Sequence, residues 1–261
     1  LGERFLSVNK ILKKRAPFYI RVNLGKATLG EVQETLKSDS IETVPDLACL
    51  TALKVLSNPR KVKQSVAYKT GLLEIQDLNS QISCRTIPIE NGYNILDFCA
   101  GGGGKSLALS DRFSGTISAY DRDFLRMKDI PVRAERSGVK IKLLSKEELG
   151  MVSSFDLVIC DVPCTGSGAW RRNPESKWTI TSDYFEALKD TQQEILDDAS
   201  KLVNRDGVLV YMTCSLLKAE NTDQIDAFLL RNSDWKVIFQ ESFPVSDSGD
   251  GFFVTHFKMS S

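Results

Sequence analysis

A chain of 261 residues exceeds the usual size of one domain, roughly 100–200 residues, and we expect two unequal domains. Apolar residues make up 42% of the sequence and charged residues 26%, which excludes an intrinsically disordered chain. The net charge of zero hides an asymmetry, because residues 1–65 hold 12 Lys and Arg against six Asp and Glu, which leaves 22 against 28 for the remainder. Such a basic segment indicates either a nucleic-acid contact or an ordinary solvated face.

The six cysteines form no CxxC pair and His256 is the only histidine, so no zinc-ligand spacing can be assembled and we expect no metal. No apolar run approaches the roughly 18 residues of a membrane span, and the first residues lack the apolar region of a signal peptide. We therefore expect a cytoplasmic, monomeric protein with reduced cysteines and no membrane contact. The chain starts at Leu1 rather than Met, which leaves open whether a further N-terminal domain precedes it.

The first elements in chain order predict a small α+β unit. Thr28 and Glu31 form a capping box, which indicates the start of a helix. A basic stretch that contains Lys61 follows an Asn-Pro turn, and we interpret it as the exit of this unit. The expected elements are a short helix before residue 17, a strand at 18–22 and a helix at 28–37. We therefore place a first domain at residues 1–65 and a second at residues 66–261.

From residue 94 onward strands and helices alternate, which is typical of a parallel sheet with helices on both faces. The expected strands are 95–98, 116–120, 139–144, 155–161, 208–213, and two more near 235–239 and 252–257. The expected helices are one that starts near residue 104 and three at 122–136, 182–203 and 216–230. We expect a turn at Asp206-Gly207 to introduce the strand at 208–213.

A glycine-rich loop follows the first of these strands, at the edge where open parallel sheets bind ligands. It misses the P-loop pattern, because Cys stands at position 99 where that pattern needs Gly, and it misses the dinucleotide pattern, because Ser106 or Leu107 stands at the third Gly. The loop residues are Cys99, Ala100, Gly101, Gly102, Gly103, Gly104 and Lys105.

An acid, Asp121, ends the next strand, where it can accept hydrogen bonds from both hydroxyls of a ribose. S-adenosylmethionine has such a ribose and no phosphates, so we expect it to be the cofactor and the glycine loop to bind it. The alternatives are a tight turn that binds nothing and, for Asp121, an ordinary turn residue.

Two cysteines follow two successive strands. Cys164 follows the most apolar strand in the segment DVPC, and Cys214 follows the next strand in the segment TCS. Both should therefore lie over the cofactor edge of the sheet. A free cysteine is more often an inert core residue, and we keep that interpretation for Cys49, Cys84, Cys99 and Cys160.

These segments resemble the Nol/Nop/Sun (Fmu-type) family of RNA cytosine-5 methyltransferases over most of the chain. Cys164 stands in a segment similar to the family's DxPCSGxG motif and Cys214 in its TCS motif, and this pair of motifs is highly specific. The other matching stretches are Ile95–Ser106, Asp121 with Arg126, Phe155–Gly168, Arg171–Glu175, Gly71 with Gln76-Asp77 and Ser80-Gln81, and Phe18–Asn23.

The resemblance implies a class I, Rossmann-like, S-adenosylmethionine-dependent methyltransferase sheet with a small N-terminal α+β RNA-binding domain. The implied reaction is methylation of carbon 5 of a cytosine in ribosomal or transfer RNA. Cys214 would be the nucleophile that adds to carbon 6 of the base, and Cys164 would assist release of the covalent intermediate.

The resemblance also gives roles to three charged residues. Asp161 would border the cofactor and bind the exocyclic amine and ring nitrogen 3 of the base. Arg126 would contact the cofactor. Lys105 would orient the base or lower the pKa of a thiol by its positive charge, although a solvated helix residue is the alternative.

Four basic residues are candidates for contacts with RNA phosphates. Arg171 and Arg172 follow the Cys164 loop, where a solvated loop is the alternative, Arg21 lies in the lead-in strand, and Lys61 lies in the basic stretch.

Three positions depart from the family pattern. Gly102 stands where Pro is usual, Thr165 where Ser is common, and Ser145 where an acid often contacts the adenine, which puts that contact in doubt. Trp170 and Trp178 are candidates to stack on bases, but core packing is the better interpretation for at least one of them.

Two other functions are compatible with such a fold. Methylation of an amino group on a base normally uses an Asp/Asn-Pro-Pro-aromatic motif, which the segment DVPC lacks. A non-enzymatic RNA-binding assembly factor would predict decay of Cys214 or of the glycine loop, and both are intact.

Overall fold

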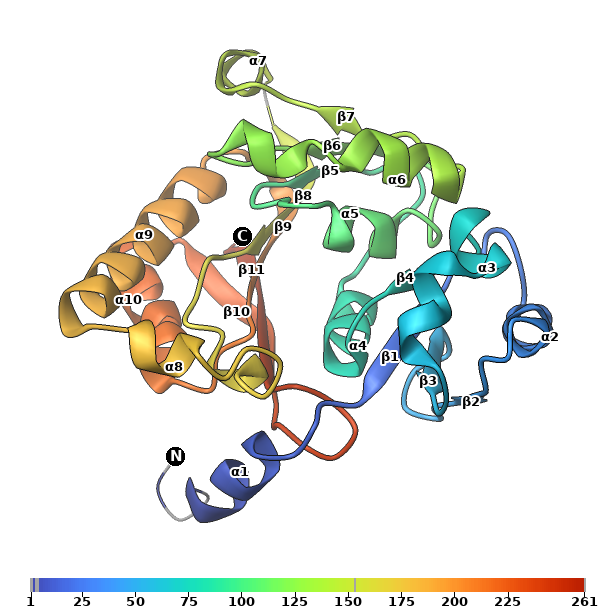
Figure 1. The fold of residues 1–261 in the computed structure, drawn as a ribbon. Coiled ribbons are helices and arrows are strands. Elements are labelled where there is room, and N and C mark those ends of the chain that lie inside the picture. Colours follow the sequence, from blue (N-terminus) through green and yellow to red (C-terminus); the bar gives the residue numbers. More distant parts are fainter. Residues whose placement is uncertain (1, 3–4, 153, 261) are drawn as a thin grey trace.

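The computed structural model describes residues 2, 5–152 and 154–260, which form two β-sheets with helices packed around them (Figure 1). The smaller, N-terminal sheet has the strand order β2-β3-β1-β4, and all its pairings are antiparallel. Its strands are β1 (Phe18–Val22), β2 (Thr43–Pro45), β3 (Ala52–Val55) and β4 (Leu73–Ile75). The predicted capping box is confirmed at the start of α2 (Leu29–Ser38), where Glu31 N donates to Thr28 Oγ1 and Thr28 N donates to Glu31 Oε2.

The N-terminal unit is longer than the 65 residues that the sequence indicated. Strand β4 pairs with β1, with Leu73 opposite Val22, and Ala67 and Leu73 are buried in the core of this unit. A boundary at residue 65 would therefore cut a sheet and its core, so the unit extends through Ile75. The three-residue strand is too short to show an alternating pattern in the sequence.

The larger sheet has the order β10-β11-β9-β8-β5-β6-β7. Strands β5 to β9 are parallel, as predicted, whereas β11 is antiparallel to both β9 and β10. The strands are β5 (Asn94–Asp97), β6 (Thr116–Ala119), β7 (Lys142–Leu143), β8 (Phe155–Asp161), β9 (Val203–Thr213), β10 (Trp235–Phe243) and β11 (Phe252–Met259).

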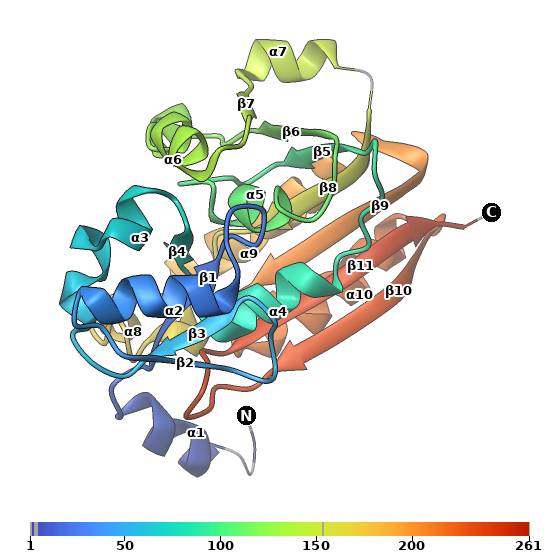
Figure 2. The same cartoon turned by 90° about the vertical axis from the view of Figure 1, so that its right-hand side faces the viewer.

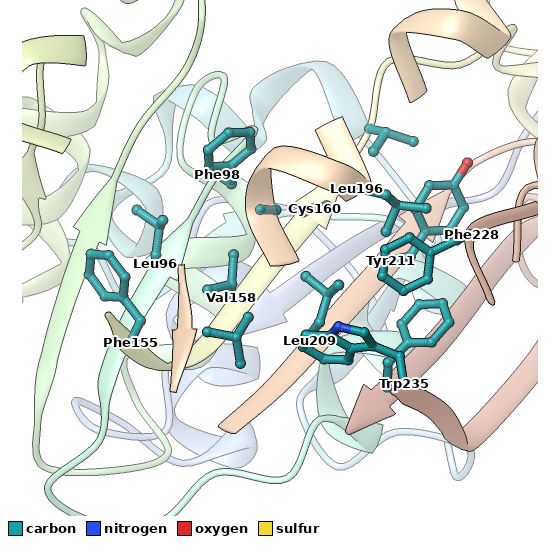
Figure 3. Packing of buried hydrophobic residues seen from close by; sticks show 14 of the residues in the cluster. Leu96, Phe98, Phe155, Val158, Cys160, Leu196, Leu209, Tyr211, Phe228 and Trp235 are labelled. Carbon is teal, nitrogen blue, oxygen red and sulfur yellow. The ribbon is translucent and has the colours of Figure 1, made fainter. Parts of the chain in front are cut away.

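Helices cover both faces of this sheet (Figures 1 and 2). One face carries α9 (Ser182–Ser200) and α10 (Thr222–Arg231), and the other carries α4 (Leu78–Thr86), α5 (Gly104–Leu109) and α6 (Ile130–Ser137). Side chains of β8 alternate between the two cores. Val158 and Cys160 pack with Leu196 of α9 (Figure 3), while Leu157 and Ile159 pack in the cluster on the α4 side.

The shorter helices lie mainly in connections. They are α1 (Phe5–Leu12), α3 (Val66–Lys69), α7 (Lys146–Met151) and α8 (Ser176–Thr179), with 3₁₀ turns at Pro59–Gln64, Phe124–Met127, Ser167–Ala169 and Lys218–Glu220. No helix in the described part of the chain is long and apolar enough to cross a membrane.

Four predicted elements differ from the structure. The strand predicted at 139–144 is reduced to the two residues Lys142–Leu143. The helix predicted at 122–136 is split into a 3₁₀ turn and α6, because Pro131 cannot donate a backbone hydrogen bond and therefore sits in the first turn of a new helix. The turn expected at Asp206-Gly207 lies inside β9, which already begins at Val203. The helix predicted at 216–230 starts only at Thr222, after a 3₁₀ turn.

Candidate active site

The glycine loop connects β5 to α5 at the carboxyl edge of the parallel strands. Gly103 has φ +78°, and a Cβ there would lie 2.9 Å from Cγ1 of Ile130, so both the backbone angle and the packing require glycine. Asp97, the last residue of β5, accepts hydrogen bonds from the backbone N and the hydroxyl of Ser106 at 3.1 and 2.6 Å. Its other oxygen is buried without a hydrogen-bond partner among the described residues. Burial raises the pKa of Asp97 to about 6, although Ser106 opposes this shift.

Asp121 joins the glycine loop to the second strand. Gly101 N donates to Asp121 Oδ2 at 2.9 Å, and Asp123 N donates to Oδ1 at 3.0 Å. The guanidinium of Arg126 lies 3.1 Å from Asp121 Oδ2, so the structure brings together the predicted acid, the loop and this arginine.

A cavity of about 760 Å³ opens beside Asp121, and its volume is in the range of small-molecule sites. Phe98, Leu144, Pro163 and Ile195 give it apolar walls, while Asp121 adds a carboxylate. This combination suits an adenosine group, because the apolar walls can cover the base and the carboxylate can accept from ribose hydroxyls.

Ser145 stands at the position where the family often has an acid that contacts the adenine. The Ser145 hydroxyl caps α7 by accepting from Glu148 N, so it is committed to the helix. Glu147 lines the same cavity and supplies a carboxylate two residues further on. Glu147 was not predicted from the sequence, although Ser145 followed by Glu148 is a recognisable capping box and places Glu147 in the first turn of a helix.

The two candidate cysteines meet at the ends of β8 and β9. These strands are parallel neighbours, with Asp161 opposite Met212, so the segments that follow them emerge side by side. The sulfur atoms of Cys164 and Cys214 lie 3.4 Å apart, and both residues are partly exposed. The expectation that both cysteines lie over one edge of the sheet is therefore confirmed.

The hydrogen bond with Cys214, together with burial, raises the pKa of the Cys164 thiol well above its ordinary value. Cys164 therefore keeps its proton at neutral pH. Cys164 is therefore poorly suited to start a reaction as a thiolate.

Lys105 and Asp161 form an ion pair with a Nζ–Oδ2 distance of 2.8 Å. Burial opposes the charge of Lys105, but the carboxylate of Asp161, with further contributions from Cys84 and Cys214, raises its pKa above the ordinary value. Lys105 also lies over the ring of Phe252, 5.0 Å from the centroid. It is a buried cation at the first turn of α5, and the interpretation as a solvated helix residue is wrong.

A second cavity, of about 400 Å³, lies beside the thiol pair. It is lined by Cys164, Thr165, Ser176, Thr179, Ile180 and Tyr184. Trp170 is half-buried and its Nε1 donates to the Thr165 carbonyl at 3.1 Å, whereas the side chain of Trp178 is 81% exposed. Helical spacing turns Trp178 away from the face of α8 that lines this cavity.

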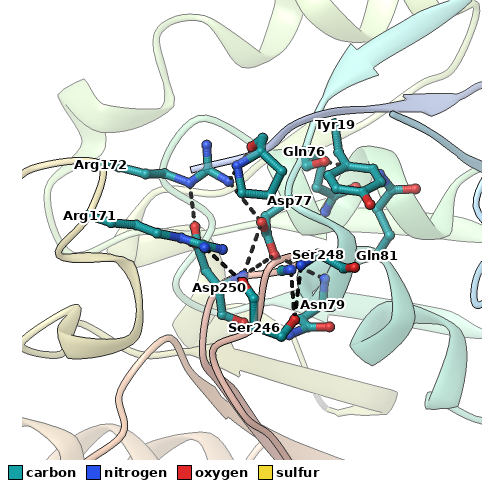
Figure 4. A network of polar contacts seen from close by, with 12 residues as sticks. Tyr19, Gln76, Asp77, Asn79, Gln81, Arg171, Arg172, Ser246, Ser248 and Asp250 are labelled. Carbon is teal, nitrogen blue, oxygen red and sulfur yellow. Dashed lines mark hydrogen bonds and ion pairs between the residues drawn. The ribbon is translucent and has the colours of Figure 1, made fainter. Parts of the chain in front are cut away.

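Two of the four basic residues expected to contact RNA are buried in ion pairs. Arg171 Nε lies 2.7 Å from Asp250 Oδ1, and Arg171 Nη1 donates to the Ser246 carbonyl at 2.7 Å (Figure 4). Arg21 pairs with Asp111 at 3.2 Å, and both side chains are 5% exposed. The expectation that Arg171 and Arg21 are free to contact phosphates is wrong, because their charges are neutralised inside the protein.

Arg172 belongs to the same network, where it bonds to Asp250 and, at 2.8 Å, to Asp77 (Figure 4). Its side chain is 36% exposed, so it reaches solvent only in part. Lys61 is exposed. Among the described residues, no group of three or more His, Cys, Asp or Glu is arranged to hold a metal ion.

The strand order, the glycine loop and the acid after the second strand define a Rossmann-like S-adenosylmethionine-dependent methyltransferase fold. The sequence profile of the family described as 16S rRNA methyltransferase RsmB/F matches residues 85–258. The chain belongs to this family.

Individual relatives agree with this assignment. The chain is 31% identical to ribosomal RNA small subunit methyltransferase B of Klebsiella pneumoniae (strain 342), over 92% of this chain and 59% of the relative. It is 28% identical to the protein of the same name from Vibrio vulnificus (strain YJ016), over 96% of this chain and 62% of the relative. The chain thus spans about three fifths of the length of these curated relatives.

Solved structures show the same fold. The crystal structure of PH0851 matches with a TM-score of 0.91 and 30% identity, over 99% of this chain and 63% of that one. The structure of NSun6 from Pyrococcus horikoshii with SFG matches with a TM-score of 0.84 and 19% identity, over 98% of this chain and 94% of that one. At that identity the second match supports the fold alone.

Proposed function

We propose that this protein transfers a methyl group from S-adenosylmethionine to carbon 5 of a cytosine in RNA, through a temporary bond between Cys214 and carbon 6. The observation that carries the proposal is the pair of thiols 3.4 Å apart on the same edge of the sheet as the Lys105–Asp161 ion pair. The names of the relatives favour ribosomal RNA of the small subunit over transfer RNA as the substrate.

Carbon 5 of cytosine is a poor nucleophile, so the base must first be activated. The Cys214 thiolate adds to carbon 6, and the electrons of the 5,6 double bond move to carbon 5, which becomes the nucleophile. When bound, S-adenosylmethionine supplies the electrophilic methyl group that carbon 5 then takes up. Loss of the proton on carbon 5 restores the double bond and expels the Cys214 thiolate.

Asp161 and Lys105 would act on the base as Cys214 adds. The carboxylate of Asp161 would bind the exocyclic amine and protonated ring nitrogen 3, which stabilises the charge pattern of the adduct. Lys105 lies 2.8 Å from Asp161 and keeps that carboxylate in place. Its positive charge also favours the thiolate form of a nearby cysteine.

Cys164 would then accept the proton from carbon 5. The largest cause of its raised pKa is the hydrogen bond with Cys214, and this bond is lost once Cys214 is joined to the base. The pKa of Cys164 therefore falls at the stage at which a base is needed. Once the bond with Cys214 is lost, Cys164 would release its own proton to solvent through the second cavity, which it lines, and its thiolate would then accept the proton from carbon 5.

The residues around the first cavity fit the cofactor. Asp121 would accept from the ribose hydroxyls, and the apolar wall that includes Leu144 and Pro163 would cover the adenine. The unpartnered oxygen of Asp97 offers an acceptor for the ammonium group of the cofactor. The target base would enter from the second cavity, which Cys164 lines, and this requires an unpaired or flipped-out nucleotide.

The N-terminal unit would bind RNA through exposed cations. Lys61 and its neighbours Arg60 and Lys63 are all exposed on a 3₁₀ turn, in contrast to Arg21, whose charge is neutralised by Asp111. Exposed Lys and Arg side chains bind phosphates without sequence preference.

The experiment that tests this proposal is transfer of labelled methyl from S-adenosylmethionine to total RNA, followed by mapping of the product at nucleotide resolution. We expect the label on carbon 5 of cytosines in small-subunit ribosomal RNA. Label on an exocyclic amine would refute the cysteine chemistry, and labelled DNA beside an unlabelled RNA pool would refute the substrate class.

A further inference from the structure

Glu220 is a fully buried carboxylate that connects the two cysteine loops. Its exposed fraction is 0%, and it takes part in none of the ion pairs that the described residues form. Instead, Oε1 accepts from Thr165 N at 2.8 Å and from Gln192 Nε2 at 3.1 Å, and Oε2 accepts from Thr165 Oγ1 at 2.5 Å and from the Ser215 hydroxyl. A buried carboxylate is tolerated only with such a full set of donors.

The two loop residues that bind Glu220 are the ones that directly follow the candidate cysteines. Thr165 follows Cys164 after β8, and Ser215 follows Cys214 after β9. One side chain therefore fixes the chain immediately after each thiol. Gln192, which reaches in from α9, ties the same carboxylate to the helix layer and also donates to the Pro163 carbonyl at 2.9 Å.

The next residue, Asn221, holds Cys214 from both sides. Its Oδ1 accepts from Thr213 Oγ1 at 2.6 Å, and its Nδ2 donates to the Ser215 carbonyl at 2.9 Å. Thr213 and Ser215 flank Cys214 in the sequence, so the backbone of the cysteine is held on either side.

We infer that Glu220 is the positioning residue for the thiol pair, holding the two cysteine loops at the separation that lets both thiols act on one base, with Asn221 supporting the Cys214 side. This inference rests on the proposed function, because the separation of the two thiols matters only where both act on one base. The contacts that Glu220 makes with the two loops do not depend on that function. A misplacement of about 1 Å in a reacting group can cost about 10²-fold in rate, so fixed loops matter for the chemistry.

The substitution Glu220→Gln removes the negative charge of this side chain but can keep its hydrogen bonds to the two loops. The amide oxygen can accept from Thr165 N and Gln192, and the amide nitrogen can donate to the hydroxyls of Thr165 and Ser215, which rotate to accept. Glu220→Ala removes all four bonds. Should the alanine variant not fold, the double variant Thr165→Val with Ser215→Ala detaches both hydroxyls from Glu220 and leaves the carboxylate in place.

The test measures how readily dibromobimane, a reagent that bridges two nearby thiols, links Cys164 to Cys214 in the isolated protein, with the linked peptides identified by mass spectrometry. We expect the Glu220→Gln protein to cross-link at least as fast as the wild type, and Glu220→Ala or the double variant to lose about tenfold or more in cross-linking rate. The matched control is Asp156→Asn. Asp156 accepts from Asn94 N and Asn204 Nδ2 at the start of β8, whereas Cys164 follows the end of that strand.

A folded Glu220→Ala or double variant that cross-links at the wild-type rate would overturn the inference, and so would an equal loss in Asp156→Asn.

The pH profile of Cys164 alkylation gives a second readout that a merely structural role would not move. The negative charge of Glu220 is among the causes that raise the Cys164 pKa, so Glu220→Gln should shift this profile to lower pH. Neither measurement uses RNA or cofactor, so a protein that cross-links as expected but does not methylate RNA refutes only the proposed function.

Discussion

At the scale of single residues, mutual contact distinguishes the two candidate cysteines from the others, because Cys99 is partly exposed as well. Burial raises the pKa of Cys84 to about 11 and that of Cys160 well above its ordinary value, so both are inert core thiols. Cys164 and Cys214 are partly exposed and lie in contact with each other. In the proposed mechanism, one of these thiols bonds to the base and the other accepts a proton.

Asp161 gives a prediction at this scale. Asp161→Asn keeps the shape of the side chain but removes the charge that would stabilise the protonated base, so kcat should fall about 10²–10³-fold with little change in the KM for RNA. Steady-state methyl transfer with labelled cofactor measures both constants. Asp156→Asn, at the other end of β8, is the matched control, and an Asp161→Asn enzyme with the wild-type kcat would exclude this role.

At the scale of elements, the conformation of the glycine loop requires glycine at position 103 but not at position 104. Gly103 has a positive φ and no room for a Cβ, whereas a Cβ on Gly104, the first residue of α5, would have no atom within 4 Å. Two adjacent glycines therefore serve different purposes, and only one of them is required by the conformation.

Gly103→Ala should cost about 1–3 kcal/mol, seen as a lower free energy of unfolding or, where the loop shifts to relieve the strain, as weaker cofactor binding. Gly104→Ala should leave both quantities near the wild-type values or improve stability slightly. Urea unfolding and calorimetric titration with S-adenosylmethionine measure the two effects. The explanation fails should the two variants behave alike.

The parallel sheet and the convergence of the cysteines could be predicted from the sequence, because each depends on a local pattern. Alternating strands and helices predict a parallel sheet, and motifs that follow neighbouring strands must meet at one edge. Glu220 could not be predicted in this way, because its role depends on donors from positions 165, 192 and 215. The burial of Arg171 depends in the same way on Asp250, which is distant in the sequence.

At the scale of the whole molecule, a polar network ties the N-terminal unit to the catalytic sheet (Figure 4). Asp250, which precedes β11, binds Arg171 and Arg172, and Arg172 also bonds to Asp77 and to the Pro17 carbonyl near β1. Arg171 and Arg172 were candidates for RNA contact, but in the structure both bind Asp250 between the two sheets.

Asp250→Ala should therefore destabilise the protein, by about 3–5 kcal/mol, because it leaves the buried guanidinium of Arg171 without its counter-ion. Asp247→Ala, in the same loop, removes only the exposed pair with Lys14 and should give no measurable change. Urea unfolding of both variants beside the wild type is the measurement. Equal stabilities would show that the network does not hold the molecule together.

The central claim is that Cys214 bonds to the base and Cys164 releases it, and the most direct measurement is isolation of a covalent protein–RNA complex. The Cys164→Ala protein is incubated with S-adenosylmethionine and 16S ribosomal RNA, and the adduct is digested and mapped by mass spectrometry. We expect the adduct to accumulate, the RNA to be attached to Cys214, and Cys214→Ala to form neither adduct nor methylated product. Full methyl transfer by Cys214→Ala, or an adduct on another residue, would contradict this claim.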